Sequence, residues 1–336
     1  MGEFELLAKL RERLPEAGAR VRLGSGDDAA VSVPGGATAT SVDAVVDGVH
    51  FRRGEAELAT IGRKALSTAL SDLAAMGAEP GEAYVVLGVP PDMSEEDCLR
   101  LLDGMLAVAG ASGTTLAGGD VTAAPALTLA VTVVGHAEAP ERLVSRAGAE
   151  PGDLLVLTGE LGGAAAGRLL LDDPGLRSAV AEETARLLIG RQLDPTPRLR
   201  SGRALAAAGA RALIDLSDGL AADAGHLARE SGVAARVEAS SLPLAKGLAE
   251  VAAAAGREPL QTAVAGGEDY ELLAALAPER LEEASVLVGQ AAETTLTPIG
   301  EVTAGCGVEI RLPGGASLPR AAATGFDHLA GSREGR

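Results

Sequence analysis

The pattern of apolar and polar positions in the first half of the chain predicts helices and strands in alternation. β-Branched residues are frequent over 37–46, which indicates a strand, and a helical periodicity follows over 55–76 and ends at Gly77. The segment 94–97, Ser-Glu-Glu-Asp, has the N-cap and the early acids of a helix start. The elements predicted for this half are a helix at 3–14, a strand at 37–46, a helix at 55–76, a strand at 85–89, a helix at 94–109 and a strand at 127–134.

A second series of elements begins after a predicted turn at 150–153. It comprises a strand at 154–157, helices at 162–171, 178–190 and 199–208, a strand at 212–215 and a helix at 220–230. Because strands alternate with helices in both halves, the pattern predicts two α/β or α+β units. We expect an N-terminal domain over 1–145, a C-terminal domain over 146–330 and a frayed tail at 331–336.

Length and composition agree with two folded domains. The chain has 336 residues, and single hydrophobic cores stop growing at roughly 250–300 residues. Apolar residues make up 47% of the chain but aromatic residues only 1%, so the cores must be built from Ala, Val and Leu. The sequence has no uncharged apolar run of about 18 residues, so we expect no membrane span.

The formal net charge of −18 argues against nucleic acid as a binding partner. Lys9, Lys64 and Lys246 are the only lysines, and the basic stripe that is typical of nucleic-acid-binding proteins is missing. A protein this acidic needs metal ions to neutralise any phosphate that it handles. Cys98 and Cys306 lack metal-ligand spacing and the N-terminus lacks a signal-peptide pattern, so we expect a cytoplasmic protein with two free thiols, a single bridge being the alternative.

The most informative feature is a set of short motifs that carry acids, each predicted to lie where a strand or helix begins or ends. Beside apolar segments such as 31–33 and 213–214, a carboxylate costs free energy unless it is paired or bound to metal, and Lys and Arg are scarce nearby. Carboxylates that converge without cations resist ionisation, whereas Mg²⁺ takes oxygen ligands and shares substrate phosphates. The motifs are Gly26-Asp27-Asp28, Ser41-Val42-Asp43, Ser71-Asp72, Gly118-Gly119-Asp120 and Asp215-Leu216-Ser217-Asp218-Gly219.

Each motif taken alone has a simpler interpretation. Asp beside Gly or Ser is usually a turn residue or a helix cap, and this interpretation is favoured for Asp27-Asp28 by itself. Asp72 differs, because it lies in the largely apolar helical segment 65–76, where an unpaired Asp has poor helix propensity and poor burial. The occurrence of five such motifs together favours magnesium-assisted phosphate chemistry.

Two glycine-containing segments leave alternatives open, because the chain has neither a P-loop nor the motif set of protein kinases. Residues 159–163, Gly-Glu-Leu-Gly-Gly, follow a strand and open a helix. They form either a phosphate seat at a helix N-terminus or a simple tight turn. Residues 266–271, Gly-Gly-Glu-Asp-Tyr-Glu, form either a capped helix start or a substrate-recognition loop.

Isolated polar residues are similarly ambiguous. Arg146 is either a phosphate contact at the domain junction or a solvated surface charge. His50 follows the strand that carries Asp43, which suits a substrate contact, although a lone His is usually structural. His136 and His226 lack metal-ligand spacing, and we interpret both as structural.

Taken together, the motifs resemble those of the thiamine-monophosphate kinase family. They occur in that family's order and span nearly the whole chain, and the set is specific although each motif alone is not. The matching segments are 26–31 (Gly-Asp-Asp-Ala-Ala-Val), 41–51 (Ser-Val-Asp-Ala-Val-Val-Asp-Gly-Val-His-Phe), 70–80 (Leu-Ser-Asp-Leu-Ala-Ala-Met-Gly-Ala-Glu-Pro), 118–122 (Gly-Gly-Asp-Val-Thr), 215–220 (Asp-Leu-Ser-Asp-Gly-Leu), 266–272 (Gly-Gly-Glu-Asp-Tyr-Glu-Leu) and 325–328 (Gly-Phe-Asp-His).

The resemblance implies an α/β (α+β) fold of two domains, shared with aminoimidazole ribonucleotide synthetase, selenophosphate synthetase and a hydrogenase-maturation dehydratase. It implies an N-terminal sheet that pairs with that of a second subunit in a homodimer barrel, and a C-terminal α/β domain that covers the site. It also implies direct transfer of the ATP γ-phosphoryl group to thiamine monophosphate, with several Mg²⁺ ions as cofactors.

The resemblance also implies roles for individual residues. The implied magnesium ligands are Asp28, Ser41, Asp43, Asp72, Asp120, Asp215 and Asp218, with the backbone of Val42. The implied nucleotide contacts are Gly119, Asp120, Arg146 and Ser217, and the implied thiamine contacts are His50, Glu268 and Phe326. No general base is expected, because the attacking group is already a phosphate oxygen, and Asp43 and Asp72 are expected to be central.

Three residues depart from the family's usual pattern. Val42 and Val121 stand where Thr is common, and Phe326 stands where other members can carry a different aromatic residue. The change at Val42 removes a side-chain ligand, although the backbone carbonyl group remains. None of the three changes removes a carboxylate.

Rival interpretations come from the same fold and from another class of protein. Selenophosphate synthetase would need a reactive Cys or Sec and a Lys near the N-terminus, but residues 1–30 contain no Cys and only Lys9. The hydrogenase-maturation enzyme would need a C-terminal Cys, which is missing, and the motifs at 266–271 and 325–328 argue against aminoimidazole ribonucleotide synthetase. The rival of another class is a non-catalytic, acidic, cation-binding protein.

Overall fold

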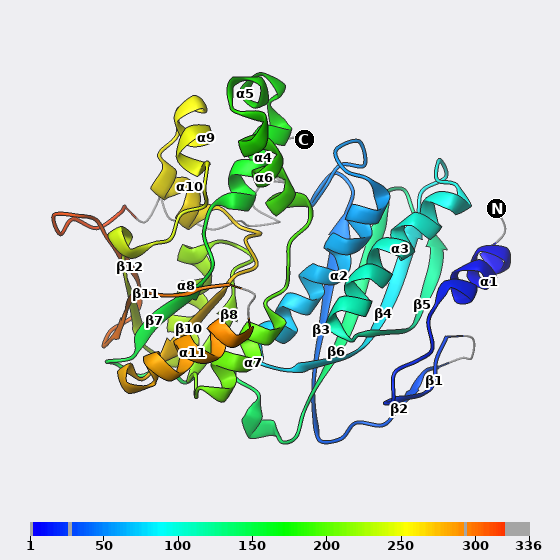
Figure 1. Ribbon diagram of the computed structural model, residues 1–336, viewed down its shortest axis with the longest axis horizontal. Coiled ribbons are helices and arrows are strands. Elements are labelled where there is room, and N and C mark those ends of the chain that lie inside the picture. The colour runs from blue at the N-terminus through cyan, green and yellow to red at the C-terminus, as the bar shows by residue number, and fades with distance from the viewer. Residues whose placement is uncertain (1–2, 26–28, 292–293, 320–336) are drawn as a thin grey trace. The chain divides into compact units, whose positions relative to one another are not determined.

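The computed structural model describes residues 3–25, 29–291 and 294–319 (Figure 1). The chain divides into two compact units. Unit 1 comprises Met1–Ala74 and Ala78–Leu143, and unit 2 comprises Ala75–Gly77 and Val144–Arg336. Each unit combines helices with a sheet, as expected, whereas the domain limits drawn from the sequence remain a prediction. Within the described part of the chain, no helix has the length and hydropathy needed to cross a membrane.

Unit 1 is built on a four-stranded sheet with the strand order β3-β6-β4-β5, in which only β4 and β5 are parallel. Its strands are β3 (Ala37–Val46), β4 (Glu79–Val89), β5 (Thr115–Ala123) and β6 (Thr128–Ala137). Its helices are α1 (Glu3–Arg13), α2 (Leu58–Ala75) and α3 (Glu95–Ser112), followed by the 3-10 turn η1 (Pro140–Arg142). A separate antiparallel pair is formed by β1 (Val21–Leu23) and β2 (Val31–Ser32).

Helices α2 and α3 lie side by side on one face of this sheet (Figure 1). Two glycines allow their backbones to approach closely. A Cβ atom on Gly62 would lie 2.0 Å from the carbonyl oxygen of Leu101, and one on Gly104 would lie 1.8 Å from that of Ala59. A side chain at either glycine would push the helices apart, so these positions fix the layer that carries Asp72.

The sheet of unit 1 has one covered and one open face. Leu129, Val131 and Val133 of β6 alternate along the strand and are buried under the helices. The positions of β6 between these residues point to the other side of the sheet. On that side lie Val42 of β3, which is 67% exposed, and Val86 of β4, which is 44% exposed. We call this side, which carries Val42 and Val86, the open face; a large apolar residue is costly there unless another surface covers it.

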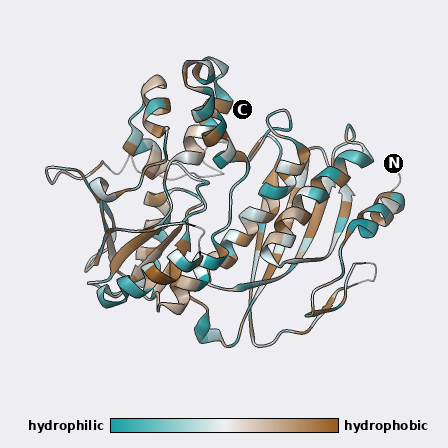
Figure 2. Ribbon diagram, in the orientation of Figure 1, coloured by the Kyte–Doolittle hydropathy of each residue, from teal (hydrophilic) through white to brown (hydrophobic). Residues whose placement is uncertain are grey.

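Unit 2 is built on a six-stranded sheet with the order β12-β9-β11-β7-β10-β8, whose central strands are strongly hydrophobic (Figure 2). Its strands are β7 (Leu154–Thr158), β8 (Ala212–Asp215), β9 (Ala234–Glu238), β10 (Leu272–Leu276), β11 (Leu296–Thr303) and β12 (Gly307–Arg311). Its helices are α4 (Gly163–Asp172), α5 (Pro174–Ala179), α6 (Glu182–Leu193), α7 (Leu199–Ala207), α8 (Leu220–Ser231), α9 (Leu248–Ala254), α10 (Pro259–Ala265) and α11 (Leu281–Ala291), with 3-10 turns η2 (Ala239–Ser241) and η3 (Pro278–Arg280). Aliphatic side chains from β7, β8 and β10 form the core with the surrounding helices.

One predicted helix of unit 2 is wrong in its bounds. The single helix expected at 178–190 is two helices, because Asp173 caps α5, Pro174 begins it, and the chain is extended at Val180 before α6 starts. The strand at 212–215 and the buried strand at 154–157 are confirmed, the second with one more residue at its end.

The two thiols occupy opposite environments, and neither forms a disulfide. Cys98 is buried in α3, where desolvation, aided by the nearby charge of Asp97, raises the pKa of its thiol to about 11. Cys306 is exposed between β11 and β12. We therefore expect Ellman's reagent to label one thiol per native chain rapidly, and both thiols after unfolding. Substitution Cys306→Ser should abolish the rapid phase; rapid labelling that survived it would show that α3 opens.

Candidate functional site

A serine and an aspartate from different elements of unit 1 meet on the covered side of its sheet. Ser41 lies in β3 and Asp72 in α2, and the Ser41 hydroxyl donates a hydrogen bond of 2.5 Å to Asp72 Oδ2. Both residues are only partly exposed. Asp72 thus lies within an apolar helix, as the sequence predicts, and a neighbouring hydroxyl satisfies part of its hydrogen-bonding capacity.

Asp43 lies two residues beyond Ser41 on the same strand, so it points to the same side of the sheet. Its Oδ1 accepts the backbone N–H of Ala44 at 2.7 Å. The intervening Val42 points to the open face. His50 follows in the turn after β3, where its Nδ1 accepts the backbone N–H of Val46 at 3.1 Å, so the ring is anchored to the strand that carries Asp43.

Asp120 lies on the opposite side of the sheet from Asp43. Across the four strands, Asp43 is in register with Val131, Val85 and Gly119, whereas Asp120 is in register with Val86 on the open face. The two acids are also on opposite edge strands, β3 and β5, three strand spacings or about 14 Å apart. Unit 1 therefore groups Ser41, Asp43 and Asp72, but by itself does not bring Asp120 to them.

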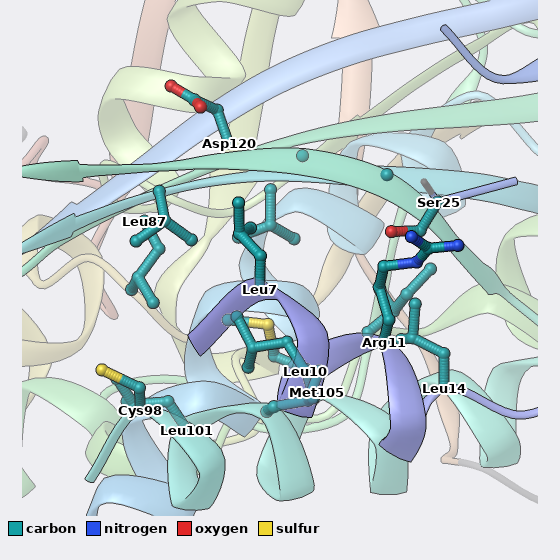
Figure 3. Close-up of a pocket in the computed structure, with 16 residues that line it drawn as sticks. Leu7, Leu10, Arg11, Leu14, Ser25, Leu87, Cys98, Leu101, Met105 and Asp120 are labelled. Atoms are coloured by element: carbon teal, nitrogen blue, oxygen red, sulfur yellow. The ribbon is translucent and has the colours of Figure 1, made fainter. Parts of the chain in front are cut away.

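An apolar pocket lies beside the Gly118-Gly119-Asp120 strand, between α1, α3 and the sheet (Figure 3). Its volume is about 100 Å³. Leu7, Leu10 and Leu101 line it, whereas the carboxylate of Asp120 points away from it (Figure 3). The glycines of β5 present backbone rather than side chains to this pocket.

The sequence predicts every acid motif at the beginning or end of a strand or helix, and for several of the described motifs this prediction is wrong. Ser41 and Asp43 are inside β3, Asp120 is inside β5 and Asp72 is inside α2, while Asp215 does end β8. The polar residues are tolerated inside strands because β3 and β5 are the sheet's edge strands in unit 1, where side chains retain access to solvent.

In unit 2 two of the predicted motifs lie against each other. The turn after β8 and the turn before β10 exchange backbone hydrogen bonds, which continues the pairing of Leu272 with Asp215. Leu216 donates to the carbonyl oxygen of Glu271 at 2.8 Å, and Glu268 donates to that of Ser217 at 2.8 Å. The proposed nucleotide contact Ser217 and the proposed thiamine contact Glu268 are therefore neighbours, although they are 51 residues apart in sequence.

A further aspartate, Asp223, fixes the turn that carries Asp218. Its Oδ2 accepts the backbone N–H groups of Asp218 at 3.1 Å and of Gly219 at 3.0 Å. Desolvation, followed by the charges of Asp215 and Asp218, raises the pKa of Asp223 to about 8. One ligand atom each from Asp218, Asp223 and His226 lie within 4.8 Å of one another, so the structure brings His226, which sequence spacing did not single out, to this cluster.

The turn at 266–271 is held in an unusual backbone conformation. Glu268 and Tyr270 have φ values of +64° and +50°, which side-chain-bearing residues seldom adopt. Gln192, a buried residue at the end of α6, donates its side-chain amide to a carboxylate oxygen of Glu268. The segment is thus an ordered loop that leads into β10, which excludes the capped helix start as its explanation.

Between these two residues, Asp269 caps helix α4 from a distance in sequence. Its carboxylate accepts the backbone N–H of Gly162 at 2.7 Å and of Ala164 at 3.0 Å. Desolvation raises the pKa of Asp269 to about 7, although these two hydrogen bonds oppose the shift. The N-terminus of α4 is therefore filled by a protein carboxylate, so the phosphate seat considered for residues 159–163 is wrong and the tight turn is correct.

Glu271 is the third acid of the segment and is 1% exposed. Arg198 binds it through two nitrogens, Nε at 2.9 Å and one terminal nitrogen at 2.6 Å, and Thr158 donates to it at 2.8 Å. A Cβ atom on Gly159 would lie 2.1 Å from Glu271 Oε1, so only glycine fits beside this carboxylate. Glu271 therefore ties β7, β10 and the start of α7 together.

The remaining predicted residues are less informative. Arg146 is exposed near the start of unit 2, where its carbonyl oxygen accepts the Ser231 hydroxyl at 3.3 Å. Asp28 and Phe326 lie outside the described residues. The proposed roles of all these residues remain predictions.

Sequence reasoning missed Asp223, Gln192 and Arg198. Asp223 has a weak signal, since an acid in the first turn of a helix is ordinarily explained by the helix dipole. Gln192 and Arg198 have none, because their partners lie more than 70 residues away.

The two units match the two halves of one protein class. AIR synthase related protein, N-terminal domain, matches residues 26–137, and AIR synthase related protein, C-terminal domain, matches residues 150–313. These matches include every described site residue except Arg146, so the fold and the acid-rich site define an AIR synthase-related protein.

Within that class, individual relatives are more specific. Thiamine-monophosphate kinase of Salmonella typhimurium is 38% identical over 307 residues, which are 90% of this chain and 91% of that protein. The crystal structure of thiamine-monophosphate kinase from Stenotrophomonas maltophilia K279a is 36% identical with a TM-score of 0.78, covering 91% of this chain and 94% of that one. AaThiL complexed with AMPPCP and TMP is 31% identical with a TM-score of 0.76, covering 87% of each chain. The chain belongs to the thiamine-monophosphate kinase family.

Proposed function

We propose that this protein transfers the γ-phosphoryl group of ATP to the phosphate of thiamine monophosphate, which gives thiamine diphosphate and ADP. The observation that carries the proposal is the 38% identity to a thiamine-monophosphate kinase over 90% of the chain. The AaThiL complex with AMPPCP and TMP adds support, because AMPPCP has the shape of ATP with a methylene group in place of the β,γ-bridging oxygen. Because the reaction uses ATP and a vitamin phosphate, we also propose a cytoplasmic location.

The residues present fit magnesium. Ser41, Asp43 and Asp72 in unit 1 and Asp215 and Asp218 in unit 2 offer only oxygen donors, which Mg²⁺ prefers. The raised pKa of Asp223 reflects desolvation and a local excess of negative charge, which a cation would relieve. Asp28, Asp120 and the Val42 carbonyl group complete the proposed set of ligands. Bound magnesium would neutralise the charge of the two phosphates that must approach each other.

The protein's own groups then act by positioning. The attacking oxygen of thiamine monophosphate is already anionic, so no side chain has to remove a proton from it, and we assign no general base. Asp72 is held by Ser41, and Asp43 and His50 are anchored to β3, so these groups are ordered before substrate arrives. Such preorganisation lowers the reorganisation that the transition state requires.

We place the adenine ring of ATP in the apolar pocket beside Gly119 as part of this proposal. Leu10, Met105 and Leu116 offer aliphatic surface to the faces of the ring, and the strand of Gly118 and Gly119 offers backbone groups to its polar edge. In unit 2, Ser217 and Arg146 are the proposed nucleotide contacts. For the thiamine substrate we propose His50, Glu268 and Phe326, of which the Glu268 carboxylate suits the cationic thiazolium or the aminopyrimidine.

We also propose a homodimer formed through the open face of unit 1. Val42 and Val86 are exposed on that face, and a second copy packed against it would remove both side chains from water.

Substitution Val42→Glu should therefore weaken self-association at least about tenfold, because a charge would be buried in the interface. Sedimentation velocity over a range of protein concentrations measures this change. Val286→Glu, at a position 53% exposed on α11 of unit 2, is the matched control and should leave the association unchanged. If Val42→Glu dimerises as well as the parent, the open face is not the interface.

Incubation with ATP, magnesium and thiamine monophosphate, followed by anion-exchange separation, tests the proposed reaction. Magnesium-dependent formation of thiamine diphosphate with an equal amount of ADP is expected. ADP without thiamine diphosphate would redirect the search to substrates of related enzymes of this fold. A folded sample without any nucleotide turnover would favour the acidic cation-binding protein, which predicts equal thermal stabilisation by any divalent salt whether or not AMPPCP is present.

A further inference from the structure

The three acids of the turn at 268–271 have different partners, and this separates their roles. Glu271 is enclosed by Arg198 and Thr158 inside the fold. Asp269 is bound to the N-terminus of α4. Glu268 accepts the side-chain amide of Gln192 on one carboxylate oxygen, while its other oxygen, Oε1, is buried and, among the residues that the structure describes, has no hydrogen-bond partner. Of the three, Glu268 is best suited to receive a cationic or hydrogen-bond-donating group of a ligand.

The backbone conformation on both sides of Asp269 determines the orientation of the Glu268 side chain. Glu268 and Tyr270 have positive φ, a conformation that costs free energy for residues with side chains. Their N–H groups donate to Ser217 and Leu216, so the strained segment is fixed along one edge. The Asp269 carboxylate fixes it from the other side through two helical N–H groups. Without that second anchor the segment could relax to negative φ, and relaxation would turn the Glu268 side chain.

We propose that Asp269 is a positioning residue for substrate recognition, which holds Glu268 in its ligand-facing orientation by capping helix α4. The inference rests on the proposed function, in which Glu268 contacts the thiamine substrate. The N-terminus of α4 then contributes to substrate specificity, because it binds the Asp269 carboxylate and thereby fixes the orientation of the neighbouring Glu268. Asp269 itself does not touch the substrate.

The test is the steady-state kinetics of Asp269→Ala. We expect the KM for thiamine monophosphate to rise at least roughly tenfold, with the KM for ATP within about twofold of the parent, because only the thiamine contact is displaced. Asp269→Asn should show a smaller rise in this KM, about threefold. The side-chain carbonyl oxygen of Asn can still accept one of the two backbone N–H groups, whereas its NH₂ group would face the other N–H and cannot accept it. If Asp269→Ala does not fold, the Asn variant carries the test, and an unchanged KM in it overturns the proposal.

Asp173→Ala is the matched control. Asp173 also caps a helix of unit 2 by accepting two backbone N–H groups, those of Gly175 at 2.8 Å and Leu176 at 3.1 Å, but it has no bond to the 266–271 segment. Loss of this cap should lower thermal stability and leave both KM values unchanged. Equal effects of the two substitutions on the KM for thiamine monophosphate would show that Asp269 acts only through stability and would overturn the proposal.

A double-mutant cycle with Glu268→Ala tests whether Asp269 acts through Glu268. In the Glu268→Ala background, Asp269→Ala should add less than about twofold to the KM for thiamine monophosphate. If the effects of the two substitutions on this KM are additive in free energy, Asp269 does not act through Glu268 and the proposal is overturned. If the parent enzyme forms no thiamine diphosphate at all, the proposed function fails and this inference with it, whereas an active parent with an unchanged KM in Asp269→Ala overturns this inference alone.

Discussion

Replacement of Asp72 by Asn is expected to lower kcat/KM for thiamine monophosphate at least about a hundredfold, or ~2.7 kcal/mol of transition-state stabilisation. The substitution keeps the size of the side chain and one oxygen that can accept the Ser41 hydroxyl, so unit 1 should remain folded. It removes the negative charge from the point where β3 and α2 bring their polar groups together. If magnesium binds there, that charge is the part of the residue that matters most.

The measurement is the initial rate of thiamine diphosphate formation over a range of magnesium concentrations. A higher magnesium requirement together with the lower rate would identify the lost group as a ligand. Asp103→Asn is the matched control: Asp103 is an exposed aspartate on the neighbouring helix α3, paired with Arg13 at 2.6 Å, and its change should leave the rate unaltered. Turnover of Asp72→Asn within about threefold of the parent, less than roughly 0.7 kcal/mol, would remove Asp72 from the centre of the site.

Much of the secondary structure follows from local sequence. The strand at 212–215 consists of three apolar residues followed by Asp215. Helix α3 begins at the capping box formed by Ser94 and Asp97, which the sequence already shows. The error at 178–190 came from a helical periodicity that continues through Val180, where the structure instead breaks the helix. Periodicity records which positions are buried, and both α5 and α6 bury one side, so the pattern alone does not show the break.

The edge strand β5 shows a second limit. Its Gly118-Gly119-Asp120 segment has the composition of a turn, and the sequence predicts it at the end of a strand or helix. In the structure the segment is paired with β4 over its whole length, and a Cβ atom on Gly119 would lie 2.0 Å from the carbonyl oxygen of Val85. The glycine is there because the neighbouring strand lies close, and a single sequence cannot distinguish that reason from a turn.

The candidate site shows the same division. The acids themselves could be found from the sequence, because carboxylates beside apolar segments need an explanation. Their partners could not, since the Ser41–Asp72 and Glu268–Gln192 contacts exist only once distant elements are packed. The distribution of Asp43 and Asp120 over opposite faces of one sheet likewise depends on strand register, which local pattern does not fix.

Substitution of Arg198 by Ala is expected to cost unit 2 about 3–5 kcal/mol of unfolding free energy, the largest effect on stability that we predict. Glu271 is 1% exposed and, among the residues that the structure describes, would keep only the Thr158 hydroxyl as a side-chain donor, so its charge would be buried without compensation. The expected shift in thermal midpoint is roughly 6 °C or more, measured by calorimetry or circular dichroism. The control is Arg177→Ala, which breaks an exposed pair with Glu182 at 3.9 Å and should cost less than about 1 kcal/mol. If the two variants unfold alike, the Arg198–Glu271 pair does not stabilise unit 2. The order of the neighbouring segment 266–271 must then come from its backbone hydrogen bonds to the 215–219 turn.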